Sequence, residues 1–188
     1  MKSINRSSLS QNGYSEIYKI DLVNNRKELI AVNVFSLVLL AMMAIPGFFI
    51  LDGYRMSFLH LLALVILIFL YIPAHELVHG AVIKVFSDEK LSFGWRLAYA
   101  YCGSNEAVFT KGEYIMVAVA PLVFFLIILS ALGVLLPSMA TVLYITDIVN
   151  VSGSAGDLYV VWRMPREKRR DILVNDTGTD MRVFSRCR

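Results

Sequence analysis

Three long stretches without charge constrain this chain more than any other feature. Residues 29–51, 56–75 and 114–146 contain no Asp, Glu, Lys or Arg. A helix that crosses a bilayer needs about 20 mostly apolar residues. Hydrophobic residues make up 57% of the 188 residues, and a small soluble globule has too much surface to hide that share of apolar side chains. These observations favour an integral membrane protein and argue against an ordinary soluble enzyme.

The uncharged stretches predict an all-α fold, a bundle of four transmembrane helices. The bundle is expected to form one membrane domain over residues 30–162, after a segment at 1–29 and before a basic tail at 163–188. The first 28 residues are polar and the first apolar run is too long for the core of a signal peptide, so none is predicted. The spans are expected near residues 30–51, 57–85, 114–136 and 139–162, with Pro137 at the tight last connection.

The positive charges predict the orientation of these spans. Of the 18 Lys and Arg residues, Arg55 alone lies between the first two spans, and the others lie before span one, around the 86–113 loop or after span four. Cytoplasmic loops carry the excess of Lys and Arg, so both termini and this loop are expected in the cytoplasm. The basic run Arg163 to Arg170 then contacts lipid headgroups. With a net charge of +3, no nucleic-acid partner is expected.

The 86–113 loop carries a strand signature. Large side chains alternate with small or polar ones over residues 91–102, and the turn signal Gly103-Ser104-Asn105 follows. Alternation with period two is typical of a strand. We therefore predict a β-hairpin over residues 90–110 at the cytoplasmic membrane surface, which is compatible with an interfacial belt of Trp and Tyr. Cys102, within the alternating stretch, and Cys187 are expected to be free thiols.

An HExxH motif at residues 75–79 carries the chemistry. His75 and His79 are four residues apart, so on a helix they share a face and can bind one metal ion. Glu76 can then act as general base on a water molecule at that metal. The remaining histidine, His60, lies about 22 Å away along the same helix. Ionisable groups inside an apolar span are functional by default, although a hydrogen-bonded cluster within the bundle is the alternative.

A catalytic zinc site needs a third protein ligand, and depth in the membrane selects it. His79 lies roughly 8 Å inside the cytoplasmic boundary and Asp157 roughly 9 Å. Asp157 is therefore the predicted third ligand, with Glu113 or Glu106 as the alternatives. Asp147 lies about 15 Å deeper than Asp157 and is expected to be structural.

One polar stripe on the fourth span supports this choice. Asp147, Asn150, Ser154 and Asp157 fall within an arc of roughly 80° on a helix, and such a stripe must face the bundle interior or a water cavity. Asn150 could orient a substrate carbonyl or make a hydrogen bond between helices. The small residues at 152–156 permit close helix contact or an unwound segment, and both possibilities stay open.

The motif resembles that of the site-2 protease type of intramembrane zinc metalloprotease, although Asp157 lies in Ser-Ala-Gly-Asp-Leu and not in an Asn-Pro-Asp-Gly motif. More closely, the chain resembles a family of short bacterial membrane proteins described as "putative zincin peptidases". The resemblance implies zinc held by His75, His79 and Asp157, with Glu76 as acid/base, in a bacterial plasma membrane. The matching stretches are Ile20-Asp21-Leu22, His75 to Gly80, Phe93-Gly94-Trp95, Ala98-Tyr99, Lys111 to Tyr114, Pro121-Leu122, Ser152 to Leu158 and Asp176 to Phe184.

The expected function is Zn²⁺-dependent hydrolysis of peptide bonds in membrane-associated proteins near the cytoplasmic face. The predicted strand could hold an extended substrate by strand addition, with Phe93, Trp95 and Leu97 as contacts. The alternative is a non-catalytic metal-binding scaffold that regulates partner proteins and does not need Glu76. Three histidines are too few for a di-iron oxygenase, and the chain lacks the paired interrupted helices typical of many transporters.

Overall fold

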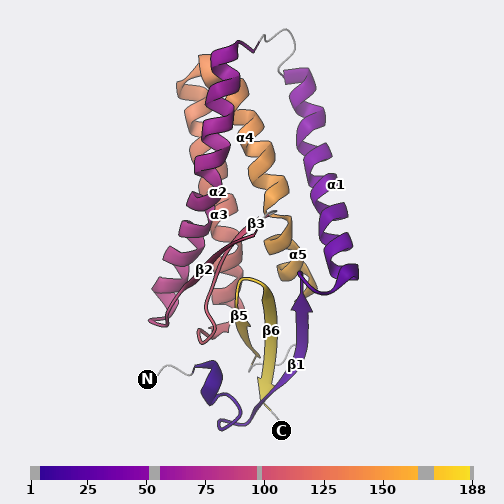
Figure 1. The fold of residues 1–188 in the computed structure, drawn as a ribbon, viewed down its shortest axis with the longest axis vertical. Helices are drawn as coiled ribbons and strands as arrows, with labels where there is room; N and C mark the ends of the chain where they lie inside the picture. The colour runs from indigo at the N-terminus through magenta and orange to yellow at the C-terminus, as the bar shows by residue number, and fades with distance from the viewer. Residues whose placement is uncertain (1–4, 51–55, 97–98, 165–171, 187–188) are drawn as a thin grey trace.

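The fold is described from a computed structural model of residues 5–50, 56–96, 99–164 and 172–186 (Figure 1). The described residues form an elongated bundle of helices with strands gathered at one end. Short 3-10 helices lie at Arg6–Ser8 and Pro137–Met139. The α-helices are α1 (Arg26–Ile50), α2 (Phe58–Phe86), α3 (Lys111–Leu135), α4 (Ala140–Gly153) and α5 (Ala155–Arg163).

The prediction of an all-α fold was wrong, because the described residues also form two β-sheets. Strands β1, β6, β5 and β4 make a four-stranded antiparallel sheet in that order, and β2 pairs with β3 in a second sheet. Their bounds are β1 Tyr14–Asp21, β2 Ser92–Arg96, β3 Tyr99–Gly103, β4 Phe109–Thr110, β5 Ile172–Asp176 and β6 Asp180–Arg186.

Three helices, α1, α2 and α3, are long and apolar enough to cross a membrane, which suggests a membrane protein. The region predicted as a fourth continuous span is divided into α4 and α5. The break lies at Ser154, whose backbone N–H and hydroxyl both bond to the carbonyl of Asn150. A hydroxyl that bonds back to a carbonyl in the preceding turn commonly bends a helix. Consequently α5 begins with a first turn of its own, and Asp157 lies in that turn.

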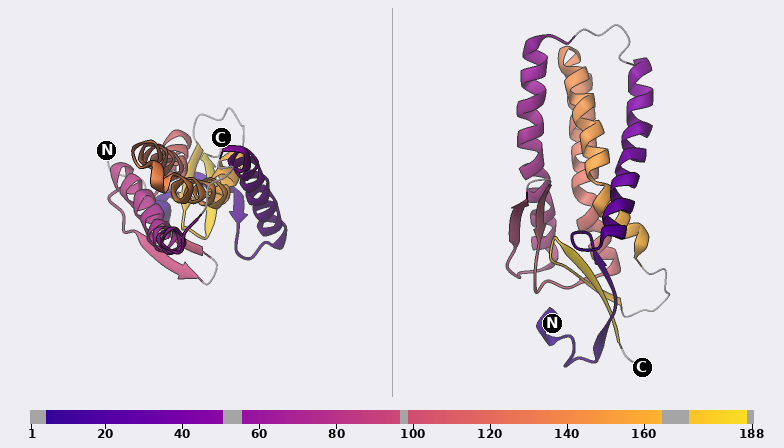
Figure 2. Two further views of the ribbon diagram at one scale, coloured as in Figure 1. Left: turned by 90° about the horizontal axis from the view of Figure 1, so that it is seen from above. Right: turned by 45° about the vertical axis from the view of Figure 1, so that its right-hand side comes forward.

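The two ends of the chain belong to the fold. Strand β1 pairs along β6, with Tyr14 opposite Arg186, so the segments before α1 and after α5 share one sheet. Figure 2 shows this sheet beneath the lower ends of the helices, on the same side as β2 and β3. Buried residues of the sheet, among them Ile20, Val174 and Val183, pack with Ile83 of α2 and Val160 of α5 in one hydrophobic core.

The hairpin lies partly elsewhere than predicted. Strands β2 and β3 divide the alternating stretch between them, and β4 pairs with β5 in the other sheet. Because opposed residues share a face, Phe93 lies on the same face as its partner Cys102, while Tyr101 lies on the other face opposite Gly94. Both strands lie within the predicted range 90–110, but the turn signal Gly103-Ser104-Asn105 comes at the end of β3 and not between the strands, where residues 97–98 lie outside the described residues.

The turn between β5 and β6 packs directly against the end of β3. A side chain at Gly103 would lie 2.3 Å from the backbone of both Thr177 and Gly178. Gly178 itself has φ +84°, in the left-handed region that favours glycine. The backbone N–H of Ser104 also donates to the carbonyl of Asp176 at 2.8 Å. The carboxyl-terminal hairpin therefore holds β3 against α2, beside the HExxH motif.

Candidate metal centre

Helices α2 and α5 bring together His75, His79 and Asp157. The Nε2 atom of His75 lies 3.6 Å from Oδ2 of Asp157, and Nε2 of His79 lies 3.5 Å from Oδ1. One donor atom from each residue lies within 4.8 Å of the others. Both imidazoles are buried, while 29% of the Asp157 side chain is exposed. The cluster is thus enclosed on the histidine side and partly open at the carboxylate.

This donor set fits zinc. Two bonds of about 2.1 Å at a tetrahedral angle place their donors about 3.4 Å apart, close to the observed separations between the imidazoles and Asp157. Two His nitrogens and one carboxylate oxygen are also a common ligand set of catalytic zinc sites. Asp157 lies in the first turn of α5, where the positive end of the helix dipole stabilises a carboxylate.

Both imidazoles are held by hydrogen bonds on the side away from Asp157. Nδ1 of His79 lies 2.9 Å from the carbonyl oxygen of Val117 on α3. Nδ1 of His75 lies 2.7 Å from the hydroxyl of Tyr71, one helical turn earlier on α2. The ring of Phe125 stacks against His75 with an interplanar angle of 9°. These contacts fix the ring orientations and leave both Nε2 atoms directed at Asp157.

Glu76 lies beside the cluster. Its carboxylate is near enough to His75, His79 and Asp157 for their charges to interact, and it also interacts with the backbone N–H of Cys102 on β3. Burial, together with the negative charges of Glu76 and Asp176, raises the pKa of the Cys102 thiol to about 12. The thiol is therefore protonated at neutral pH, so Cys102 contributes its backbone to the site and not a reactive sulfur.

The deeper polar residues of α4 form hydrogen bonds with the neighbouring helices α2 and α3. Asn150 is fully buried; its side-chain oxygen accepts from the Tyr71 hydroxyl at 3.0 Å, and its nitrogen donates to the Leu122 carbonyl at 3.1 Å. Asp147 accepts from the hydroxyl of Ser130 at 3.3 Å. The side-chain amide of Asn150, on α4, thus connects α2 and α3. This is the hydrogen bond between helices that was one of the two predicted roles for Asn150.

The alternative ligands lie in other arrangements. Glu113 and Thr110 form a capping box at the start of α3, with 2.7 Å from the Thr110 N–H to the carboxylate. The carboxylate of Glu106 accepts from the backbone N–H of Ser7 at 3.0 Å. His60 forms the corresponding capping box with Ser57 at the start of α2. The structure brings none of these three residues into the cluster of His75, His79 and Asp157.

The predicted substrate contacts lie on β2, which packs over α2 at Gly80. A side chain at Gly80 would meet the ring of Phe93 at 3.0 Å and the sulfur of Cys102 at 3.3 Å. Phe93 and Trp95 nevertheless remain 53% and 60% exposed. Leu97 lies outside the described residues. An apolar face therefore flanks the HExxH motif at the end of the helices where the strands lie.

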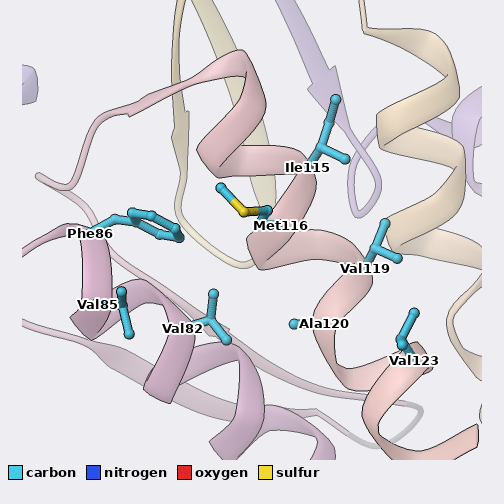
Figure 3. A pocket seen from close by; sticks show the side chains of 8 residues that line it. All are labelled: Val82, Val85, Phe86, Ile115, Met116, Val119, Ala120 and Val123. Carbon is cyan, nitrogen blue, oxygen red and sulfur yellow. The ribbon is translucent and has the colours of Figure 1, made fainter. Parts of the chain in front are cut away.

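An apolar groove of about 400 Å³ lies between α2 and α3, and it is distinct from the metal cluster (Figure 3). None of its lining side chains can transfer a proton, and none is a His, Cys or carboxylate ligand of the kind that zinc takes, so the groove is not a candidate active site. The lining residues are Val82, Val85, Phe86, Ile115, Met116, Val119, Ala120 and Val123.

Three membrane-length helices suggest a membrane protein, and a buried cluster of two histidines and one carboxylate is a candidate metal site. The chain belongs to the family described as "Putative zincin peptidase", whose model matches residues 68–171, more than half of the chain. This confirms the predicted resemblance to that family and points to a zinc metallopeptidase; the relation to site-2 proteases stays a prediction. The matched range includes the HExxH motif and Asp157. No curated protein and no solved structure matches the chain.

Sequence reasoning missed Tyr71 as part of the site. It lies four residues before His75, as His75 lies four residues before His79, so the three share one face of α2. A hydroxyl on the metal-binding face of an apolar helix needs a buried partner. That spacing was the available signal, and it was hidden because Tyr is also common at membrane interfaces.

Proposed function

We propose that this protein is a membrane-embedded zinc metallopeptidase that hydrolyses peptide bonds of membrane-associated proteins near the cytoplasmic face. The observation that supports it most is the geometry of the cluster. His75, His79 and Asp157 offer three donors to one point, and Glu76 lies beside them. Zinc, when bound, supplies a Lewis acid that polarises a carbonyl and makes water nucleophilic near neutral pH.

The residues of the chain then have separate tasks. His75, His79 and Asp157 bind the metal, and Glu76 accepts the proton of the attacking water at a carboxylate oxygen and passes it to the leaving amine nitrogen. The backbone N–H of Cys102 lies near enough to interact with the carboxylate of Glu76. Burial of both imidazoles limits the access of bulk water to the histidine side of the site, which strengthens these polar interactions.

The number of donors favours catalysis over a purely structural or regulatory metal site. Structural zinc sites are closed by four protein ligands, whereas catalytic sites use three and leave one position open. Among the described residues the cluster contains three donors, and Asp157 is partly exposed. The scaffold alternative would also give no reason for Glu76 to lie among these charges.

The substrate is proposed to bind as an extended strand along β2. Among the described residues β2 pairs with β3 alone, so its other edge can accept main-chain hydrogen bonds. Phe93 and Trp95 would then contact apolar side chains of the substrate. A helical substrate must first unwind, because its amides are otherwise engaged in hydrogen bonds.

The site is proposed to face the cytoplasm of a bacterial cell, in the plasma membrane. Strands β1 and β6 lie at the same end of the helices as β2 and β3 (Figure 1), and nearly all Lys and Arg residues belong to the sequence segments that flank the helices on that side. The bilayer and a peptide or transmembrane protein are therefore the proposed partners. This arrangement agrees with the preference of positive charge for the cytoplasmic side.

The test compares the wild type with Glu76→Gln in proteoliposomes that contain a single-span membrane protein as substrate. We expect cleavage to fall about 10²- to 10⁴-fold, the usual contribution of general acid–base catalysis, with zinc content unchanged. Glu89→Gln, which neutralises a carboxylate in the loop after α2, is the matched control and should cleave like the wild type. Equal cleavage by Glu76→Gln and the wild type would overturn the proposal.

A further inference from the structure

The hydrogen bonds behind both histidines lead to one helix, α3. His79 reaches the Val117 carbonyl directly, and His75 reaches the Leu122 carbonyl through Tyr71 and Asn150. All of these contacts are between 2.7 and 3.1 Å. Helix α3 contributes no metal ligand among the described residues, so it acts on the site through these carbonyl contacts and through the ring of Phe125, which stacks against His75.

A proline makes the first acceptor available. In an α-helix the carbonyl of residue 117 accepts from the N–H of residue 121. Residue 121 is Pro121, inside α3, and proline has no N–H. The carbonyl of Val117 is thereby released from the helix ladder, and Nδ1 of His79 lies 2.9 Å from it. A carbonyl can only accept, so Nδ1 of His79 carries a proton, and in the neutral imidazole Nε2 then presents its lone pair.

The Leu122 carbonyl fixes the direction of each hydrogen bond that connects it, through Asn150 and Tyr71, to His75. The Leu122 carbonyl can only accept, so the Asn150 nitrogen faces it and the Asn150 oxygen faces Tyr71. Tyr71 therefore donates its single hydroxyl proton to Asn150. Its oxygen is left to accept from Nδ1 of His75. As in His79, Nε2 of His75 then presents a lone pair to the position beside Asp157.

We propose that Tyr71, Asn150 and Pro121 are positioning residues that hold both histidines as the Nδ1–H tautomer, with Nε2 free for the metal. The proposal rests on the metal site of the proposed function. It assigns an effect to residues that bind neither metal nor substrate. Partners behind metal-binding histidines typically change metal affinity 10- to 100-fold when they are removed.

The first test is Tyr71→Phe, which removes one oxygen atom, in purified protein in detergent. We expect zinc to bind about 10- to 100-fold more weakly in a chelator competition. Tyr144→Phe is the matched control, since Tyr144 is also a helix residue with a donating hydroxyl, which bonds to the backbone carbonyl of Met43 at 2.7 Å. The zinc affinity of this variant should equal that of the wild type.

A second readout needs no metal. The chain has three histidines, so ¹⁵N labelling of histidine gives a spectrum simple enough to assign the tautomers of the apo protein, followed by pH titration up to the range in which the imidazoles are neutral. We expect the wild type to show Nδ1–H for His75 and His79, and Tyr71→Phe to show a mixture for His75 alone. An unchanged tautomer and an unchanged zinc affinity in Tyr71→Phe would overturn the proposal. A wild type that binds no zinc but keeps both tautomers would overturn the proposed function instead.

The proline is tested by Pro121→Ala, with Pro46→Ala in α1 as the control for removal of a helix proline. The restored N–H competes for the Val117 carbonyl, so zinc affinity should fall about 10-fold, the lower end of the usual range, because a carbonyl has two lone pairs. The melting temperature of the apo protein should not fall in parallel, because alanine is the better helix former. Wild-type zinc affinity in Pro121→Ala would contradict the role given to Pro121.

Discussion

Asn175 offers a sharp test of the finding that the carboxyl-terminal strands belong to the fold. The residue lies on β5 and is fully buried. Its side-chain nitrogen donates to the carbonyl oxygens of Ser104 at 2.9 Å, Ala107 at 2.8 Å and, more weakly, Asn105 at 3.3 Å. These carbonyls belong to the segment between β3 and β4, so one amide joins the end of the chain to the hairpin beside the metal cluster.

The effect of Asn175→Ala follows from these contacts. Removal of the amide leaves two well-bonded buried carbonyls without a donor, at about 1–2 kcal/mol each. The side-chain oxygen of Asn175 has no partner among the described residues, and its loss returns about 1 kcal/mol. The net expectation is a decrease of about 2 kcal/mol in the free energy of unfolding.

The assay uses Cys102 as the reporter, in a Cys187→Ser background. Because burial holds the pKa of the Cys102 thiol near 12, the folded protein should not react with a maleimide at pH 8, and labelling during a denaturant titration follows unfolding. Asn33→Ala is the control, since Asn33 also donates to one carbonyl, at 2.8 Å, but is exposed; a change within about 0.5 kcal/mol is expected. Equal stability of Asn175→Ala and Asn33→Ala would refute the reasoning.

Two further predictions concern the same end of the molecule. Gly103→Ala should lower the free energy of unfolding by about 3 kcal/mol, the upper end for overpacking, because the added Cβ would meet the Gly178 backbone at 2.3 Å. Gly112→Ala is the control and should not lower the free energy of unfolding, because the space around Gly112 is open. Equal melting temperatures of the two variants would contradict this prediction. Burial alone would raise the pKa of Asp21, but hydrogen bonds from Asn24 and other donors outweigh it and hold the pKa below its usual range. The ionised form is thus favoured in the folded state, and its contribution is present above about pH 4 and lost at lower pH. Asp21→Asn should make stability between pH 5 and pH 2 less dependent on pH, and an unchanged slope would contradict the assignment.

The local parts of the structure could be predicted from the sequence. The long stretches without charged residues predict membrane helices, and α1, α2 and α3 begin and end within a few residues of three of the predicted spans. The four-residue spacing of His75 and His79 places both side chains on one face of a helix, and this does not depend on how the helix packs in the fold. Counting residues from the charged ends sufficed to place Asp157 at the depth of His79, and the structure brings the three together. Their role as zinc ligands stays a prediction.

The rest depends on contacts between distant parts of the chain. Tyr14 and Arg186 pair across almost the whole sequence, and no pattern within either segment indicates the partner. The pattern of the tail is also obscured, because β5 buries residues on both faces and so lacks a clear alternation. Likewise, Asn150 could be recognised as polar and inward-facing, but only the fold shows that Tyr71 and Leu122 are its partners.

The most direct test of the central claim is the zinc content of the purified protein and of two aspartate variants. We predict one zinc per chain in the wild type and in Asp147→Asn, whose side chain is buried but lies outside the cluster. Asp157→Ala should lose the metal during purification, because it removes one of three ligands. Full zinc occupancy in Asp157→Ala, or no zinc in the wild type, would contradict the account.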